Sequence, residues 1–217
     1  MRYYSAMRML VFLLPLMLLA QRPVPIDNEW ARVVIATAAP GPKGRMHKHD
    51  RNRVMVYLDK GTQVIGYENG SAKTISAAAG EVQWDPKGGM HTSTIPSGPT
   101  FRIVEIELKK EGGSVAWPKA DPLKVAPEIY SVEFENKQVR VLRVTLGPRQ
   151  KIAQHEHAVA RIVVPLTEVD MAVIAADGTR TFLKGNSGDV IFGRPGRHRE
   201  ENTLNKPVEL ILVELKG

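Results

Sequence analysis

Short segments rich in β-branched residues recur along the whole chain, and turn residues separate them. Residues 31–37 and 139–145 are two such segments, and residues 101–108 and 208–215 are two more. β-branched and aromatic side chains favour extended strands. The sequence contains no amphipathic pattern of ten or more residues that would indicate a helix. It therefore predicts an all-β fold, an antiparallel barrel or sandwich.

Two hairpins are predicted at matching places. Asn69-Gly70 and Asp177-Gly178 each stand between strand-like segments. Such dipeptides suit the positive φ angles of a type I′ turn, so we expect two hairpins with that turn.

The chain repeats itself after about a hundred residues. A shift of 108, which becomes 107 after one lost residue, brings these pairs together: Asn28 and Asn136, Arg53 and Arg161, Gly70 and Gly178, Gly80 and Gly188, His91 and His198. An ordered match of this length indicates a tandem duplication. We predict two barrels, residues 22–112 and 125–217, and a linker at 113–124. Trp117 in this linker is expected to pack over a barrel mouth.

The N-terminus has the pattern of a secretory leader. Arg2 and Arg8 precede a run of twelve residues, 9–20, without a polar side chain. Twelve apolar residues are too few to span a bilayer but suit a signal peptide. We assign residues 1–21 to a signal peptide. The expected location is periplasmic or extracellular, without a stable membrane anchor once the leader is removed.

Composition excludes several classes of chemistry. With no cysteine, the chain of 217 residues has no disulfide and no thiolate metal site. Without the leader, 28 basic and 23 acidic residues remain, a net charge of +5. These charges are scattered, so we expect no nucleic-acid partner, and the charge supports only a mild attraction to anionic partners. A homodimer is compatible with this organisation.

All six histidines fall at corresponding places in the two units. Each unit has two histidines one residue apart and a third some forty residues later: His47, His49 and His91, then His155, His157 and His198. Side chains two residues apart on a strand share a face. Three imidazoles can bind a divalent transition metal such as Fe, Mn, Ni, Cu or Zn.

These motifs resemble those of the cupins, and specifically the two-domain bicupins. The first unit matches with Gly41, His47, His49 and Gly61, then Gly80, Pro86, Gly88 and His91; the second matches with His155, His157, Gly188, Gly196, His198 and Asn202. The resemblance implies a conical antiparallel barrel of the jelly-roll type in each unit, with its three histidines in the barrel mouth. Ile95 replaces the motif asparagine of the first unit. The first unit has the undisturbed spacing from Gly80 to His91, which favours it slightly as the better metal site.

Both units depart from the family at one metal ligand. Arg53 and Arg161 stand where the family has its metal-binding glutamate, and a guanidinium has no acceptor for a metal. Each arginine either forms an internal ion pair or binds the carboxylate of a substrate, and we favour the substrate. The sequence predicts a metal-capable pocket for a small anionic molecule. By resemblance it is an oxygenase or an isomerase, or else a metal-free, non-catalytic binding or sensing module. No catalytic residue is assigned.

Overall fold

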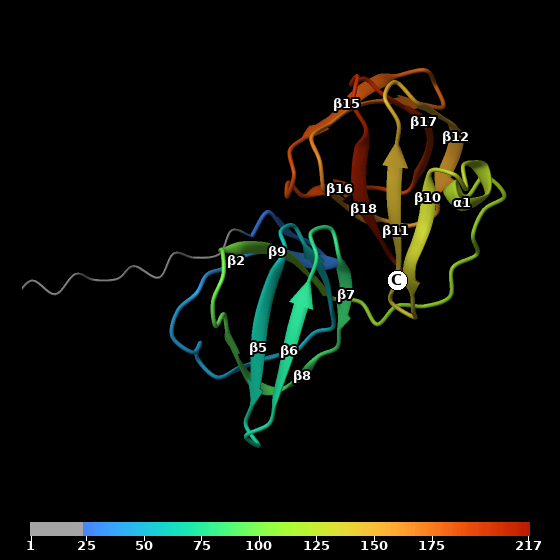
Figure 1. Ribbon diagram of the computed structural model, residues 1–217. Helices are drawn as coiled ribbons and strands as arrows, with labels where there is room; N and C mark the ends of the chain where they lie inside the picture. The colour runs from blue at the N-terminus through green and yellow to red at the C-terminus, as the bar shows by residue number, and fades with distance from the viewer. Residues whose placement is uncertain (1–23) are drawn as a thin grey trace, which may run out of the picture.

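The computed structural model describes residues 24–217, so the predicted leader at 1–21 lies outside the described residues. Residues 26–108 form the first barrel, which runs from blue to green in Figure 1. Its two antiparallel sheets have the strand orders β1-β2-β9-β4-β7 and β3-β8-β5-β6. The strands are β1 (Ile26–Asp27), β2 (Ala31–Ala38), β3 (His47–His49), β4 (Arg53–Tyr57), β5 (Gly61–Tyr67), β6 (Ala72–Ala77), β7 (Val82–Asp85), β8 (Gly88–Thr94) and β9 (Phe101–Leu108).

The second barrel repeats this plan, from yellow to red in Figure 1. Its sheets have the orders β10-β11-β18-β13-β16 and β12-β17-β14-β15. The strands are β10 (Tyr130–Glu135), β11 (Val139–Leu146), β12 (Lys151–His157), β13 (Arg161–Pro165), β14 (Val169–Ala175), β15 (Arg180–Gly185), β16 (Ile191–Gly193), β17 (Gly196–Asn202) and β18 (Val208–Leu215). One helical turn, α1 (Pro122–Val125), precedes β10. The prediction of an all-β fold with two tandem antiparallel barrels is confirmed.

The two five-stranded sheets pack against each other and form one core between the barrels. It joins apolar side chains of β2, β4 and β9 to those of β11, β13 and β18. All five residues of β4 are buried, because Val54 and Val56 face the other barrel while Met55 and Tyr57 face the interior of their own. Strands buried on both faces have continuous hydrophobic runs instead of alternating ones. This packing explains why the sequence of these strands shows no clear alternation.

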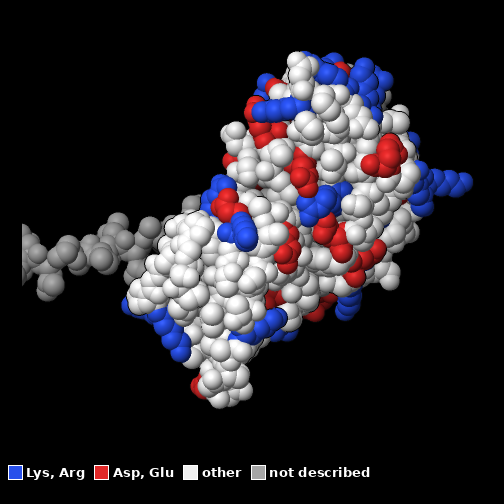
Figure 2. Space-filling model, in the orientation of Figure 1, with Lys and Arg blue, Asp and Glu red and all other residues white. Residues whose placement is uncertain are grey.

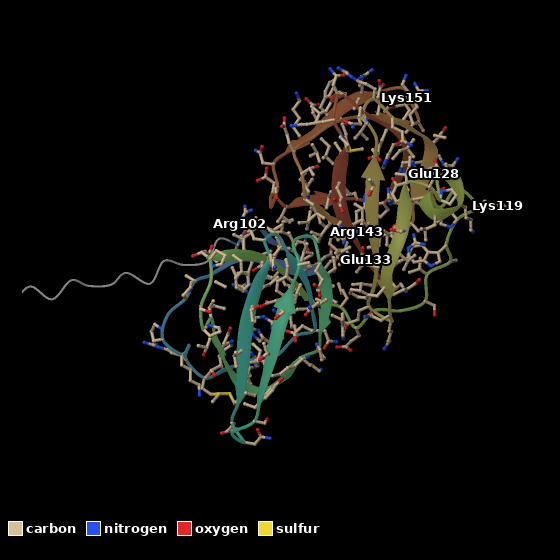
Figure 3. All side chains as sticks on the ribbon, in the orientation of Figure 1. Arg102, Lys119, Glu128, Glu133, Arg143 and Lys151 are labelled. Atoms are coloured by element: carbon tan, nitrogen blue, oxygen red, sulfur yellow. The ribbon has the colours of Figure 1, made fainter. Side chains whose placement is uncertain are left out.

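Polar contacts also join the barrels at the edge of this core. Arg143 Nη2 donates to the carbonyl of Gly80 at 2.7 Å, and Asn52 Nδ2 donates to Gln138 Oε1 at 2.5 Å. Figure 3 shows Arg143 beside Glu133, whose carboxylate accepts from Arg143 Nε at 2.5 Å. The two barrels are therefore connected by hydrogen bonds as well as by apolar packing.

The two hairpins exist, but the predicted type I′ turn is wrong. Gly70 and Gly178 have φ values of 83° and 88°, whereas Asn69 and Asp177 are not in the positive-φ region. In the first hairpin Gly70 N donates to Tyr67 O at 3.1 Å. This pattern fits a three-residue hairpin that ends in a glycine bulge. The asparagine and aspartate instead accept backbone N–H groups through their side chains, which is the other local role of these residues.

On the face shown in Figure 2, basic and acidic side chains are interspersed, most densely over the second barrel. Within residues 24–217, no helix is long and apolar enough to span a membrane.

Candidate metal centres

Strand pairing brings each set of three histidines together. His47 on β3 is directly opposite His91 on β8, and His155 on β12 is directly opposite His198 on β17. The second histidine of each pair, His49 or His157, follows two residues later and shares the same face. All six predicted histidines therefore lie in two clusters, one per barrel, which we call the first triad and the second triad.

The two triads have nearly the same geometry. In the first triad the ring centroids are 5.0, 4.6 and 5.2 Å apart. In the second triad the corresponding distances are 5.0, 4.6 and 5.3 Å. Within each triad one ring nitrogen of every histidine lies within 4.8 Å of the others. Both triads can therefore place three nitrogen ligands around one metal ion.

Backbone carbonyls orient the rings. Nδ1 of His47 lies 2.9 Å from the carbonyl of Arg45, and Nδ1 of His155 lies 3.0 Å from that of Ala153. His91 makes the equivalent contact with Gly89 at 3.0 Å. A carbonyl only accepts, so Nδ1 must carry the proton and Nε2 keeps its lone pair. Metal-binding histidines are commonly oriented in this way.

The triads differ in burial. The first is half-buried, whereas His155, His157 and His198 are 0%, 2% and 8% exposed. Burial, with the Arg53 charge as a second cause, lowers the pKa of His49 to about 4. Burial also lowers the pKa of His155, and it holds the pKa of His157 well below its usual range. These three imidazoles are neutral near pH 7, which is the form that binds a metal.

One atom in the second triad lacks a hydrogen-bond partner. His198 Nε2 is buried and makes no hydrogen bond within the described part of the chain. A buried polar atom without a partner is costly, and an ion is one explanation for it. A cavity of about 20 Å³ is lined by His157 of the same triad and by Arg161 and Glu200. The second triad thus fits a metal ion, because it offers three imidazole nitrogens and because His198 Nε2 has no hydrogen bond within residues 24–217.

Arg53 is held by carboxylates of its own barrel. Its Nη1 donates to Glu105 at 2.7 Å, and its Nε donates to Asp85 at 3.0 Å. The Arg53 side chain is 7% exposed, so the pair with Glu105 is buried. Of the two alternatives for this arginine, an internal ion pair is the one present in the structure.

Arg161 has different surroundings. Its Nη1 donates to the carbonyl of Arg194 at 2.7 Å, and no carboxylate among residues 24–217 forms an ion pair with it. Arg53 is opposite Asp85 on β7, whereas Arg161 is opposite Gly193 on β16. On its other side Arg161 is opposite Glu214 of β18, but that carboxylate pairs with Arg140 instead. Burial lowers the pKa of Arg161, although not enough to remove its charge near pH 7. Arg161 therefore brings to the wall of the cavity a positive charge without a carboxylate at ion-pair distance, although Glu200 lines the same cavity.

Two acidic residues at the second triad were not predicted. Glu214 Oε1 lies 3.2 Å from His157 Nδ1, on the side of the ring away from the triad centre. Glu200 Oε1 lies 3.3 Å from His198 Nε2, without hydrogen-bond geometry, and Oε2 lies 3.8 Å from His155 Nε2. The period-two rule could have found Glu200, because it follows His198 by two residues on β17.

A buried network of ion pairs contacts His157 through Glu214. The other oxygen of Glu214 accepts from Arg140 Nε at 2.5 Å, and Arg140 Nη2 donates to Asp121 at 2.7 Å. Trp117 packs on this arginine, with its ring centroid 3.4 Å from the guanidinium carbon. Trp117 thus has a packing role, against Arg140 of the second barrel. A carboxylate on the outer nitrogen of a metal-binding histidine fixes its ring and raises its basicity.

A scan against protein-family models and a search of curated protein sequences gave no match. Several solved structures are similar. Oxalate decarboxylase from Bacillus subtilis matches with a TM-score of 0.61 and 15% identity, over 87% of this chain and 69% of that chain. AerE from Microcystis aeruginosa matches with a TM-score of 0.63 and 12% identity, over 86% of this chain and 88% of that chain.

A third similar structure is a cupin 2 conserved barrel domain protein from Leptotrichia buccalis. Its TM-score is 0.53 and its identity 10%, over 88% of this chain and 86% of that chain. At such identities the likeness shows the fold. The chain therefore has the cupin fold twice in tandem, as the histidine motifs indicated.

Proposed function

We propose that this tandem cupin is an exported metal-binding protein that acts on, or captures, a small anionic molecule in its second barrel. His155, His157 and His198 would hold a divalent transition metal, and Arg161 would bind the anion. The observation that carries this proposal is the cluster of three buried imidazoles, one of which has an Nε2 without a hydrogen bond within residues 24–217. A small cavity lined by His157 and Arg161 adjoins this cluster. When bound, the metal would supply a Lewis acid or a redox centre.

Burial supports the second triad as the metal site of this proposal, whereas motif spacing gave a slight preference for the first. The first triad is half-buried and therefore more accessible to water than the second. Buried ligands lose less conformational freedom when a metal binds, and their ion is shielded from exchange with solvent.

Arg161 supports the anion part of the proposal. An unpaired guanidinium in a largely buried wall is stabilised by a carboxylate or another anion, and it can bind a carboxylate through two nitrogens. The cavity of about 20 Å³ has room for little more than one water-sized group, so the pocket suits a very small anion or one end of a larger anion.

The positive charge of Arg161 also favours a second candidate function, a metal-free anion-binding module. Three neutral imidazoles do not compensate the 2+ charge of an ion, and a guanidinium repels it. At 4 Å and an effective dielectric constant of 20 this repulsion is about 4 kcal/mol for each unit of charge. In a metal-free module the anion would occupy the pocket alone.

Metal content distinguishes the two candidates. Untagged protein is analysed by elemental mass spectrometry, and its melting temperature is measured with Mn²⁺, Fe²⁺, Ni²⁺, Cu²⁺ and Zn²⁺. Mn²⁺ is the first choice, because the similar oxalate decarboxylase is described with Mn(II) centres. We expect His155→Ala with His157→Ala to lower metal content more than His47→Ala with His49→Ala. A wild-type protein without metal, and without a thermal response to any ion, would support the metal-free module.

Anion binding is tested with the two arginines as a matched pair. We expect small carboxylates to raise the melting temperature of wild type and of Arg53→Met, but not of Arg161→Met. If both variants still respond to carboxylates, Arg161 does not bind the anion and is removed from the proposal. Loss in both would mean that the first barrel takes part in anion binding.

Export is tested separately. We expect mature protein from the native host to begin near residue 21, as measured by mass spectrometry of its intact N-terminus. A cytoplasmic protein that keeps residues 1–20 would contradict this part of the proposal and leave the metal site unaffected.

A further inference from the structure

We propose that Glu200 is a fourth metal ligand in the second barrel. It would supply from β17 the carboxylate that Arg161 displaces from β13. This inference rests on the proposed metal site of the second triad.

The position of Glu200 fits a ligand. It lies on β17 with His198, and it lines the same cavity as His157. Its two oxygens lie 3.3 Å from His198 Nε2 and 3.8 Å from His155 Nε2. Ligand atoms bound at about 2.1 Å in a tetrahedral or octahedral arrangement are about 3.0–3.4 Å apart. One oxygen already has this spacing to His198, and the other lies slightly farther than this from His155.

The contact between Glu200 and His198 has a spacing that two ligands of one ion could have. His198 Nε2 has no hydrogen-bond partner although Glu200 Oε1 is close to it. A protonated His198 would form an ion pair with this carboxylate, whereas a neutral His198 and the carboxylate could share a metal ion as two of its ligands. The Tyr130 hydroxyl lies 3.5 Å from the other oxygen of Glu200 and also 3.5 Å from His155 Nε2, so Glu200 and His155 share this neighbour.

Charge balance also supports Glu200. Without it, a divalent ion would face three neutral imidazoles and the Arg161 guanidinium. Glu200 is 12% exposed and has no ion pair with Lys or Arg among residues 24–217, so its charge is available to an ion. Carboxylate oxygen is also a normal ligand for the same metals that bind imidazole.

The first barrel lacks this group. Ser93 follows His91 by two residues on β8, in the place that Glu200 takes after His198 on β17. The nearest acid to Arg53 across the sheet, Asp85, is engaged with that arginine. The first triad would therefore bind a metal through histidines alone, which makes the two barrels different kinds of site.

The test isolates the second barrel by placing His47→Ala and His49→Ala in the full chain as background. Co²⁺ is titrated optically into this background and into its Glu200→Gln variant, and affinity is measured against a chelator. Glu201→Gln on the same strand is the matched control, because it is paired only weakly with surface cations at 3.9 Å. Each apoprotein is first checked for a cooperative thermal transition.

We expect Glu200→Gln to weaken Co²⁺ binding by at least about 10-fold, because loss of an outer-shell partner alone typically costs 10–100-fold. Its visible spectrum should also change, whereas Glu201→Gln should match the background. Equal affinity and an unchanged spectrum for Glu200→Gln would overturn the inference. A background protein that binds no Co²⁺, Mn²⁺ or Zn²⁺ would overturn the proposed metal site itself.

A structure of the metal-loaded wild type makes the test independent of variant folding. A crystal structure with Zn²⁺ or Mn²⁺ should show a Glu200 oxygen bonded to the ion at about 2.0–2.2 Å. An ion held by the three histidines with the Glu200 carboxylate more than about 3 Å away would refute its role as a ligand.

Discussion

Replacement of Arg140 by methionine should strongly destabilise the protein. Its guanidinium bridges Glu214 and Asp121 at 2.5 and 2.7 Å, and these side chains are 3%, 0% and 2% exposed. Methionine fills much of the volume but leaves two carboxylates buried without their cation. Removal of one partner from a buried ion pair costs about 3–5 kcal/mol, because a charge is left without solvent or counterion. For a chain of this size that lowers the melting temperature by about 6–20 °C.

The matched control is Arg197→Met in the same barrel. Arg197 pairs with Glu156 at 2.7 Å, but its side chain is 54% exposed, so water solvates both charges in the variant. Its loss should cost about 0–1 kcal/mol. Urea unfolding of wild type and both variants at pH 7 gives the two free energies. An Arg140→Met protein within about 1 kcal/mol of wild type would refute the reasoning.

Two further measurements separate charge from packing. A triple variant, Arg140→Met with Asp121→Asn and Glu214→Gln, should recover part of the lost stability because no buried charge remains. Because Glu214 contacts His157, Arg140→Met should also weaken metal binding by about 10–100-fold. Arg197→Met should leave metal binding unchanged.

Three other outcomes follow from the structure. The folded-state pKa of His49 is about 4 against 6.5 in the unfolded chain, so the unfolded state takes up the proton first. The free energy of unfolding of the metal-free protein should fall between pH 6.5 and 4, and His49→Gln should reduce that slope in urea titrations. Asn202→Ala should cost at least about 2 kcal/mol by urea unfolding, since its buried amide bonds two carbonyls and one N–H of the neighbouring loops. Gly61→Ala should cost about 1–3 kcal/mol by the same measurement, because its Cβ would overlap the Phe101 ring. A pH-independent stability, or near-neutral effects of the two substitutions, would contradict these expectations.

The sequence alone determined the features that depend on local pattern. Short β-branched segments and a shift of about 108 residues predicted two tandem barrels. The spacing of His155 and His157, one residue apart on a strand, placed both side chains on one face. These inferences succeed because strand periodicity and a tandem repeat are properties of neighbouring residues and of register along the chain.

Only the tertiary structure decided how the two copies differ. Arg53 and Arg161 occupy equivalent positions, but Arg53 is opposite Asp85 whereas Arg161 is opposite Gly193, on strands about thirty residues further along the chain. The Arg53 guanidinium is therefore paired with carboxylates, whereas the Arg161 guanidinium lines the cavity without a carboxylate at ion-pair distance among residues 24–217. Cross-strand partners are set by the folded register, so no local pattern predicts them.

The position of the Glu200 carboxylate was also decided only by the tertiary structure. The period-two rule places its side chain on the face of His198, yet it cannot tell whether the carboxylate reaches the imidazoles or points along the barrel wall. That depends on the curvature of β12 and β17, where the pairing shifts between Ile152 and His155. The sequence identifies which side chains share a face, and the closed barrel decides which of them meet, because closure brings together atoms from strands that are distant in sequence.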